Sequence, residues 1–318
     1  MVGGDNVKLY KKSGKFKYGQ TKRRKMKTTY GEKVFTIFLY LVLTFSLVIV
    51  LFPLIQIVSS SFSNPKAVQT GRVFLLPVDF TLKGYQAVFE NKQIMTGFMN
   101  SFIYMFGGTF ISLIVTVMAA YPLSRRELKG KKWFTLFFVF TMLFNGGMIP
   151  SYLLLKNMHL LNTRWSILLA SALSVWNMIV MRSYYENNIP DDLYEAAYLD
   201  GAGDFQCLLK IVLPLSGPIF AVICLYYAIG QWNSYFNAMI YLRNQDYFPL
   251  QIILRNILIQ NQMSGQMIKD ATQLERMQGL AQLLKYSVMV VSCLPLVIIY
   301  PFVQKFIVKG TMVGAVKG

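Results

Sequence analysis

The stretch YEAAYLDGAGDFQCLLKIVLP, residues 194–214, is polar and contains glycines, and it lies between two apolar segments that are long enough to cross a membrane. Just before it, Pro190 suits the first turn of a helix, and Asp191 and Asp192 favour the positive end of the helix dipole. Gly201 suits the left-handed position that follows a helix. We therefore predict a short helix that begins near Pro190 and ends before Gly201.

A second short helix is predicted directly after the first. Asp204 can cap its start, and Pro214 is expected to end it. The apolar stripe of this helix is predicted to consist of Phe205, Leu208, Leu209 and Val212. Together the two helices are expected to form a compact helical hairpin.

The first helix of this hairpin is expected to expose a surface that suits docking. Leu193, Ala196, Ala197 and Asp200 follow the spacing of one helical face. The two alanines are predicted to lie on the exposed side, where small side chains allow a partner to approach closely, and Glu195 offers an acceptor there. The alternative is an interfacial helix pair whose alanines only pack.

The rest of the chain is too apolar for a water-soluble globule of this size. Of its 318 residues 54% are hydrophobic and 14% are charged, and the mean hydropathy is +0.43. A membrane-spanning helix needs about 20 apolar residues, and we predict an all-α membrane protein with six transmembrane helices. The predicted spans cover residues 34–58, 102–122, 133–148, 165–181, 218–242 and 286–306.

Positive charge is concentrated at the amino terminus and in the loop after the second span. Residues 1–33 hold 11 Lys or Arg against Asp5 and Glu32, which gives +9 of the net +18. The loop holds Arg125, Arg126, Lys129, Lys131 and Lys132. Basic segments beside a membrane stay in the cytoplasm, so six crossings place both termini in the cytoplasm. The amino-terminal arm is expected to contact anionic lipid head groups there. Nucleic-acid binding is disfavoured, since no readout module follows the arm.

The predicted organisation is a basic cytoplasmic arm, residues 1–33, and one transmembrane domain, residues 34–318. Within that domain the hairpin lies in a cytoplasmic loop, residues 182–217, and the chain ends in a cytoplasmic tail, residues 307–318. The loop has six acidic against two basic side chains. Acidic residues contribute little to orientation, so the loop is still expected in the cytoplasm, and its acidity indicates a basic or amide-lined partner.

The spacing of residues in the hairpin resembles a known signature. Glu195-Ala196-Ala197, then Gly201 after three residues, Ile211 after nine more, and Leu213-Pro214 are together similar to the EAA signature of membrane subunits of ATP-binding-cassette importers. The carboxyl-terminal Lys309-Gly310, Gly314 and Lys317-Gly318 resemble the tail of carbohydrate-uptake, or maltose-type, permeases, and most of all their polysaccharide and oligosaccharide branch. The resemblance covers the six-span core to the last residue, but not the arm before Thr28.

This resemblance implies a function and a set of partners. The chain is expected to be one of two homologous permease subunits of an ATP-driven importer in a bacterial cell membrane, which takes up oligosaccharides or polysaccharide fragments delivered by an extracellular solute-binding protein. A cytoplasmic ATPase dimer is expected to bind the hairpin, through the coupling residues Glu195, Ala196, Ala197, Asp200, Gly201, Leu213 and Pro214. The tail residues Gly314, Lys317 and Gly318 are expected to contact the same ATPase.

No catalytic residue, metal site or bound cofactor is predicted in this chain. The phosphate-binding pattern G-x-x-x-x-G-K-[ST] does not occur, so ATP and Mg are expected on the separate ATPase subunits. The three cysteines are scattered and the single histidine stands alone, which disfavours a disulfide framework, a zinc site or histidine catalysis.

A second polar group interrupts the fifth apolar segment. It has the sequence QWNSYFN, residues 231–237, and polar side chains within a membrane tend to face a protein interior or a wet cavity. Aromatic faces beside amides suit sugar rings, so the predicted solute pathway includes Trp232, Asn233, Tyr235, Phe236 and Asn237. Asn145, Trp176 and Asn177 are candidates for the same cavity. Interhelical hydrogen bonding with an aromatic belt is the alternative.

Other function classes stay open on the sequence. An importer of a non-carbohydrate solute would carry the same hairpin. A self-sufficient channel or secondary transporter usually needs charged groups inside its spans, and the six apolar segments contain only Lys305, at the end of the last one. A membrane enzyme would need converging acid, base or metal ligands, and the sequence shows no such set.

Overall fold

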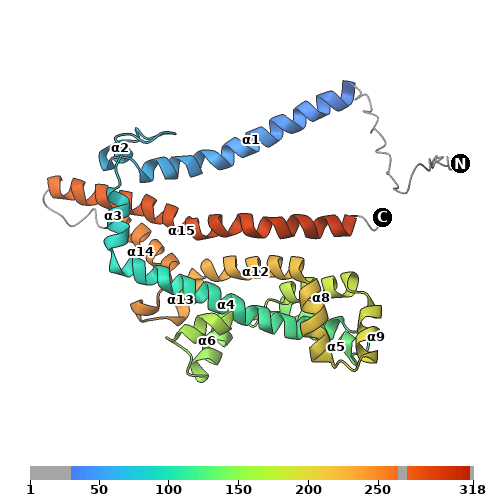
Figure 1. Ribbon diagram of the computed structural model, residues 1–318. Helices are drawn as coiled ribbons and strands as arrows, with labels where there is room; N and C mark the ends of the chain where they lie inside the picture. Colours follow the sequence, from blue (N-terminus) through green and yellow to red (C-terminus); the bar gives the residue numbers. More distant parts are fainter. Residues whose placement is uncertain (1–29, 264–270, 316–318) are drawn as a thin grey trace. The chain divides into compact units, whose positions relative to one another are not determined.

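The computed structural model describes residues 30–263 and 271–315, and within these ranges every regular element is helical (Figure 1). Most of the basic arm, together with Lys317 and Gly318 of the tail, lies outside the described residues. The elements are α1 (Tyr30–Ser61), α2 (Pro65–Gln69), α3 (Lys83–Glu90), α4 (Lys92–Ser124), α5 (Lys131–Leu143), α6 (Met148–Asn157), α7 (Arg164–Ala170), α8 (Val175–Asn188), α9 (Asp191–Leu199), α10 (Asp204–Cys207), the π-helical η1 (Leu208–Val212), α11 (Leu213–Leu215), α12 (Gly217–Trp232), α13 (Tyr235–Tyr241), the 3-10 helix η2 (Gln245–Tyr247), α14 (Leu250–Met263) and α15 (Ala271–Ala315).

The chain divides into two compact units, residues 1–52 and residues 53–318. The described part of the first unit is the amino-terminal portion of α1, an apolar helix whose side chains are exposed. The second unit begins at Pro53 within the same helix and contains all the other elements.

Among the described residues, three helices are long and apolar enough to cross a membrane unaided: Tyr30–Ser61, Lys92–Ser124 and Ala281–Pro301. Three more candidate spans arise when bent neighbours are joined, namely α5 with α6, α7 with α8, and Asp204–Leu215 with α12. The predicted all-α membrane architecture is therefore confirmed, with up to six candidate spans by length and composition, three of them broken.

The third and fourth spans are the clearest departures from straight helices. α5 ends at Leu143, and the helix direction changes by 111° before α6 begins. Asn145 lies in this break, where its side chain accepts the N–H of Gly147 at 2.8 Å, and Gly147 has φ +88°. The fourth span bends by 49° between Ala170 and Val175.

The second span begins earlier than predicted. α4 starts at Lys92 rather than Phe102, because Asn91 caps it by accepting the N–H groups of Gln93 and Ile94 at 3.0 and 3.2 Å. A side-chain acceptor at this position satisfies backbone donors that a helix start leaves unpaired. The segment before the predicted span is thus divided between α3 and the first turns of α4.

The fifth and sixth spans also have boundaries that differ from the prediction. α12 ends at Trp232, and Asn233 and Ser234 separate it from the short α13. The polar segment 243–285 between the two predicted spans is largely helical in its described part, because it contains α14 and the start of α15.

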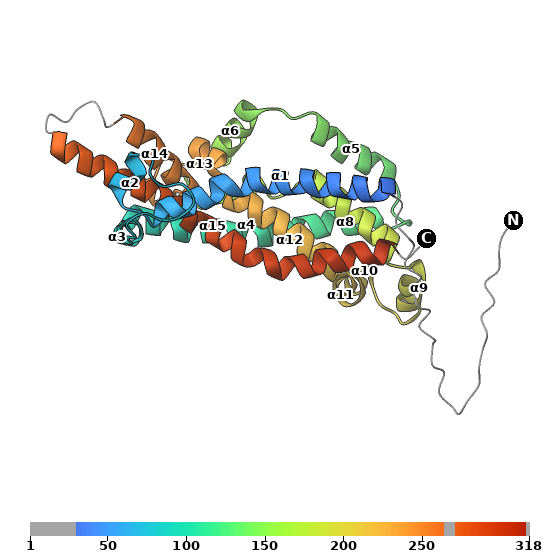
Figure 2. The same ribbon diagram turned by 90° about the horizontal axis from the view of Figure 1, so that it is seen from above.

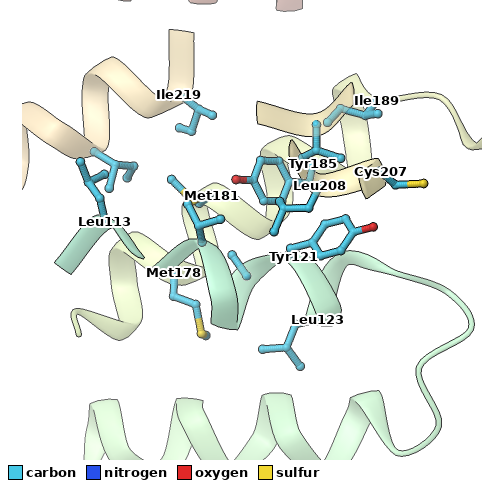
Figure 3. Packing of buried hydrophobic residues seen from close by; sticks show 14 of the residues in the cluster. Leu113, Tyr121, Leu123, Met178, Met181, Tyr185, Ile189, Cys207, Leu208 and Ile219 are labelled. Carbon is cyan, nitrogen blue, oxygen red and sulfur yellow. The ribbon is translucent and has the colours of Figure 1, made fainter. Parts of the chain in front are cut away.

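In the second unit, α4 packs lengthwise against α12, which also packs against α15 (Figure 1). The hairpin of α9, α10, η1 and α11 lies at one end of these helices, and α3 and α14 lie at the other end (Figures 1 and 2). One cluster of buried apolar side chains joins α4, α8 and α12 to the hairpin. Tyr121 of α4, Tyr185 of α8 and Leu208 of the hairpin lie close together in this cluster (Figure 3).

Candidate functional site

The first helix of the hairpin, α9, forms as the sequence predicts. Pro190 is its N-cap, and Asp191 and Asp192 occupy the first turn, where carboxylates meet the positive end of the helix dipole. Gly201 adopts φ +79°, and the N–H groups of Gly201 and Ala202 donate to carbonyls in the last turn of α9 at 3.0 and 2.9 Å. A left-handed glycine with this bonding is a common helix end, so the predicted end is confirmed.

The second half of the hairpin differs from the prediction at both ends. Asp204 does not cap the helix, because the preceding glycine holds the N-cap position and the Asp204 carboxylate instead accepts the Tyr198 hydroxyl at 2.6 Å. Pro214 does not end the helix, since α11 continues to Leu215. The turn before α11 is π-helical, and both a proline and a π-helical turn disturb the regular hydrogen-bond ladder.

Only part of the predicted docking face is exposed. Glu195 and Ala196 are exposed, whereas Ala197 is buried with Tyr194 in the cluster that joins the hairpin to α4, α8 and α12. The prediction that both alanines lie on the exposed side is therefore wrong for Ala197. The reason is that Ala197 lies one helical turn after Tyr194, and side chains three residues apart share a helix face.

The predicted apolar stripe of the second helix is split between two faces. Leu208 and Val212 are buried, whereas Phe205 is 71% exposed and Leu209 is also exposed. Leu199, at the end of α9, is 90% exposed. The hairpin therefore has one face that belongs to the core of the chain and another face that presents large apolar side chains.

The remaining predicted coupling residues lie at the two turns of the hairpin. Asp200 and Gly201 are exposed between α9 and α10. Leu213 is half-buried and Pro214 is exposed before the chain enters α12. Of the predicted tail residues, only Gly314 is among the described residues, near the end of α15.

Arg125, at the carboxyl end of α4, contacts two tyrosines of the hairpin. Its guanidinium carbon lies 3.5 Å from the ring centroid of Tyr194 and 5.9 Å from that of Tyr198, and its Nη2 pairs with Glu127 at 3.0 Å. A guanidinium over aromatic faces gains cation–π attraction, which is strongest where water is excluded. The Arg125 side chain is about nine-tenths buried.

Further contacts lie around this arginine. The Tyr121 hydroxyl donates to the backbone carbonyl of Asp204 at 3.1 Å. Arg126 pairs with Asp191 at 3.0 Å, in an exposed position where an ion pair contributes little. The hydrogen bond to Asp204, together with partial burial, raises the pKa of Tyr198 to about 12, so this hydroxyl remains a donor at neutral pH. In the sequence, Arg125 was distinguished only as one member of a basic loop.

A second candidate site is an open cavity of about 790 Å³ between the break of the fourth span and the end of α12. Its wall consists of polar and aromatic side chains, and none of the described residues that line it is Asp, Glu, Lys, Arg or His. Six of the residues predicted for the solute pathway line it: Trp176, Asn177, Asn233, Tyr235, Phe236 and Asn237.

Two predicted pathway residues are not brought to this cavity. Trp232 is buried between helices, where its Nε1–H donates to the carbonyl of Ser292 at 3.0 Å and its ring meets the edges or faces of Phe98 and Phe102. Asn145 lies in the break between α5 and α6 and does not line the cavity. Trp232 and Phe236 do not lie on one continuous helix, because α12 ends at Trp232 and Phe236 belongs to α13.

The prediction missed several polar residues in the cavity wall. Gln231 lines it and donates through Nε2 to Ser171 Oγ at 3.0 Å, while Gln231 Oε1 is buried without a hydrogen-bond partner. Tyr227 OH accepts the N–H of Ser174 at 3.0 Å and lies 2.6 Å from Thr116 Oγ1. These side chains satisfy backbone and hydroxyl groups freed by the break in the fourth span. Their signal in the sequence is a polar residue inside an apolar run.

The chain is similar to proteins of known class over most of its length. It is 36% identical over 289 residues to a polygalacturonan/rhamnogalacturonan transport system permease protein of Bacillus subtilis (strain 168), with 90% of this chain and 99% of that protein covered. An arabinooligosaccharides transport system permease protein of Halalkalibacterium halodurans is 27% identical, with 85% of this chain and 92% of that protein covered.

A solved structure and a family description agree with these relatives. A chain in the crystal structure of a bacterial ABC transporter involved in the import of the acidic polysaccharide alginate superposes with a TM-score of 0.80 at 35% sequence identity, covering 88% of this chain and 99% of that one. Residues 112–313 match the family described as binding-protein-dependent transport system inner membrane component. The chain therefore belongs to the family of inner membrane components of binding-protein-dependent transport systems.

Proposed function

We propose that this chain is a permease subunit that carries oligosaccharides or polysaccharide fragments across the membrane, and that its hairpin receives the motion of a cytoplasmic ATPase. The substrate class is supported by the relatives, whose names refer to polygalacturonan and rhamnogalacturonan, to arabinooligosaccharides and, for the solved transporter, to alginate. The cavity supports the same class, because aromatic faces and neutral amides suit rings that carry many hydroxyl groups.

The exposed face of the hairpin is the observation that carries the coupling role. It joins the acceptor Glu195 and the small Ala196 to the large apolar side chains of Leu199 and Phe205. At the end of a helix bundle that lies outside the lipid, exposed apolar surface of this kind is typical of a protein-binding site. A small residue allows close approach, and the neighbouring apolar side chains supply area to bury.

The partners proposed for this chain follow from its membership of a binding-protein-dependent system. A second homologous permease subunit completes the pathway, and an extracellular solute-binding protein delivers the solute. Two ATPase subunits bind ATP and Mg in the cytoplasm, where both termini of this chain also lie. The tail residues Gly314, Lys317 and Gly318 contact the same ATPase subunits, and this chain itself holds no nucleotide.

Affinity purification in mild detergent tests the docking face. We expect the wild-type chain to co-elute with an ATPase and a second permease, and we expect Ala196→Trp to lose the ATPase while keeping the second permease. The matched control is Leu76→Trp, at a position that is 77% exposed in the segment between α2 and α3. Full ATPase recovery with Ala196→Trp would show that the ATPase binds elsewhere.

The solute pathway is tested by uptake of a labelled oligosaccharide identified as the ligand of the binding protein. Phe236→Ala removes an aromatic face from the cavity wall, so we expect uptake to fall while the complex still assembles. The matched control is Phe110→Ala, because the Phe110 side chain is 66% exposed on α4 and does not line the cavity. Equal uptake by both variants would show that the cavity is not part of the solute pathway.

A further inference from the structure

The hairpin is connected to the membrane helices by backbone that is interrupted on both sides. Before α9 the chain leaves helical conformation at Ile189 and Pro190, which have ψ of 108° and 141°. After α11 it turns by 85° at Ser216 before α12 begins. Bent or non-helical connections transmit a displacement poorly, because a few backbone dihedral angles can absorb the rotation. A movement of the hairpin is therefore passed on poorly to α8 and α12, the helices that adjoin it in the chain.

α4 differs from these neighbours because it is one continuous helix from Lys92 to Ser124, and its proline, Pro122, lies in the last turn. Of the three long helices that share a core with the hairpin, α4 alone is long enough to cross the membrane without joining another element, whereas α8 and α12 each belong to a bent pair. A continuous α-helix of 33 residues is a stiff rod about 50 Å long. Motion applied at its carboxyl end therefore reaches its far end.

Side chains at the carboxyl end of α4 fasten it to both helices of the hairpin. Arg125 lies over Tyr194 of α9 at 3.5 Å, and the Tyr121 hydroxyl donates to the Asp204 carbonyl at the start of α10. Tyr198 and Asp204 in turn bond to each other across the hairpin. A displacement of either helix of the hairpin is therefore passed to the end of α4.

The same rod meets the cavity wall farther along its length. Gly108 of α4 is in close contact with Gln231, and Ser112 Oγ donates to the Ser171 carbonyl at 3.4 Å. One turn later, Thr116 Oγ1 lies 2.6 Å from Tyr227 OH. These contacts join α4 to both sides of the cavity, the break in the fourth span and the end of α12. α4 therefore touches the hairpin at one end and the cavity wall in its middle.

We propose that Arg125 is a positioning residue that locks the hairpin to α4, so that ATPase motion reaches the cavity through α4 rather than through the covalent neighbours of the hairpin. This inference rests on the proposed coupling role of the hairpin. The planar guanidinium suits the task because it stacks on an aromatic ring and keeps its charge when buried. Neither a lysine nor an apolar residue provides both properties.

The transport-to-hydrolysis ratio of the complete transporter, reconstituted in vesicles with its binding protein, tests this proposal. We expect Arg125→Met and Tyr194→Leu each to lower solute transported per ATP hydrolysed by at least about fivefold, as loss of a desolvated cation–π contact would. Tyr194→Phe keeps an aromatic face and should restore most of the ratio. Combining Arg125→Met with Tyr194→Leu should add little, because both remove the same contact.

The control is Lys132→Met, which removes one positive charge from an exposed position in the first turn of α5 and should leave the ratio unchanged. Co-elution of the ATPase with each variant separates two failures. If Arg125→Met loses the ATPase altogether, the side chain supports docking and the proposed α4 route is wrong. If the ATPase stays bound and the ratio equals that of the wild type, α4 does not transmit the motion.

A distance measurement checks the same claim without relying on activity. Spin labels at Met118→Cys on α4 and Asp192→Cys on α9 would be placed in a chain whose native cysteines are replaced, since Cys293 is exposed. We expect the wild-type distance distribution to stay the same with and without ATP, and to broaden with Arg125→Met. A wild-type distance that changes on ATP binding would show that the hairpin moves relative to α4, contrary to the proposal.

Discussion

Replacing Gly108 by alanine tests how closely α4 holds the cavity wall. A Cβ atom at position 108 would lie 2.5 Å from both Cδ and Nε2 of Gln231 and 2.9 Å from its Cγ. Favourable carbon contacts are about 3.5–4.0 Å long, so the Gln231 side chain must move by about 1 Å. That movement breaks its 3.0 Å hydrogen bond to Ser171 in the break of the fourth span.

Two costs contribute to the loss of stability. Displacing the end of the flexible Gln231 side chain is the smaller cost, because this residue borders the open cavity. A buried amide that loses its partner costs about 1–3 kcal/mol more, and Gln231 already has one buried oxygen without a partner. The total is therefore at least about 1 kcal/mol, which corresponds to a fall in melting temperature of at least about 2 °C.

Thermal unfolding of the purified chain in detergent, followed by tryptophan fluorescence, measures this loss. The control is Gly108→Ala combined with Gln231→Ala, in which the amide that would clash is absent. We expect the double variant to melt above Gly108→Ala alone, because neighbouring substitutions that relieve one clash are not additive. A Gly108→Ala variant that melts with the wild type would refute the close contact, and so would a double variant that loses the sum of the single losses.

Two further predictions concern the hairpin and the aromatic residues of the spans. Gly201→Val places a β-branched residue at φ +79°, which should destabilise the hairpin by about 1–2 kcal/mol and reduce co-elution of the ATPase. The control is Gly203→Ala, at φ −82° with open space around it, which should leave co-elution of the ATPase unchanged. Trp232→Ala removes a buried ring and should cost about 3–5 kcal/mol of stability, which a lower melting temperature would show. Trp176→Ala changes the cavity wall, so it should lower solute uptake and leave the melting temperature nearly unchanged. Equal melting temperatures of the two tryptophan variants would contradict this assignment.

The first helix of the hairpin was predictable from sequence because its signals are local. The carboxylates of its first turn act on the backbone of the same helix, and Gly201 ends that helix through its own φ angle. The apolar spans were predictable for a similar reason, since each is a property of one continuous segment. The family resemblance also rests on residue spacing within a short stretch.

Long-range packing explains what the sequence did not reveal. Arg125 and Tyr194 are far apart in the chain, and nothing local distinguishes Arg125 from the four other basic residues of its loop. Trp232 and Trp176 are chemically identical, yet one is buried against two phenylalanines and the other lines the cavity. Ala196 and Ala197 are neighbours, and only the position of Tyr194 in the core decides which of them is exposed.

Breaks within spans were missed for a different physical reason. Hydropathy averages over a window, so an apolar stretch with two glycines or a pair of serines still scores as one helix. The break of the fourth span persists because Gln231 and Tyr227 bond to Ser171 and Ser174 from another helix. Such compensation is visible only once the helices are packed together.

Site-specific photo-crosslinking tests the central claim, that the exposed face of the hairpin binds the ATPase, most directly. A photoreactive residue would replace Ala196, which is exposed on α9, and in a separate variant Leu76, which is exposed in the segment between α2 and α3. The account predicts an adduct with the ATPase from position 196 and none from position 76. An adduct from position 76, or none from position 196 in a complex that still contains the ATPase, would contradict it.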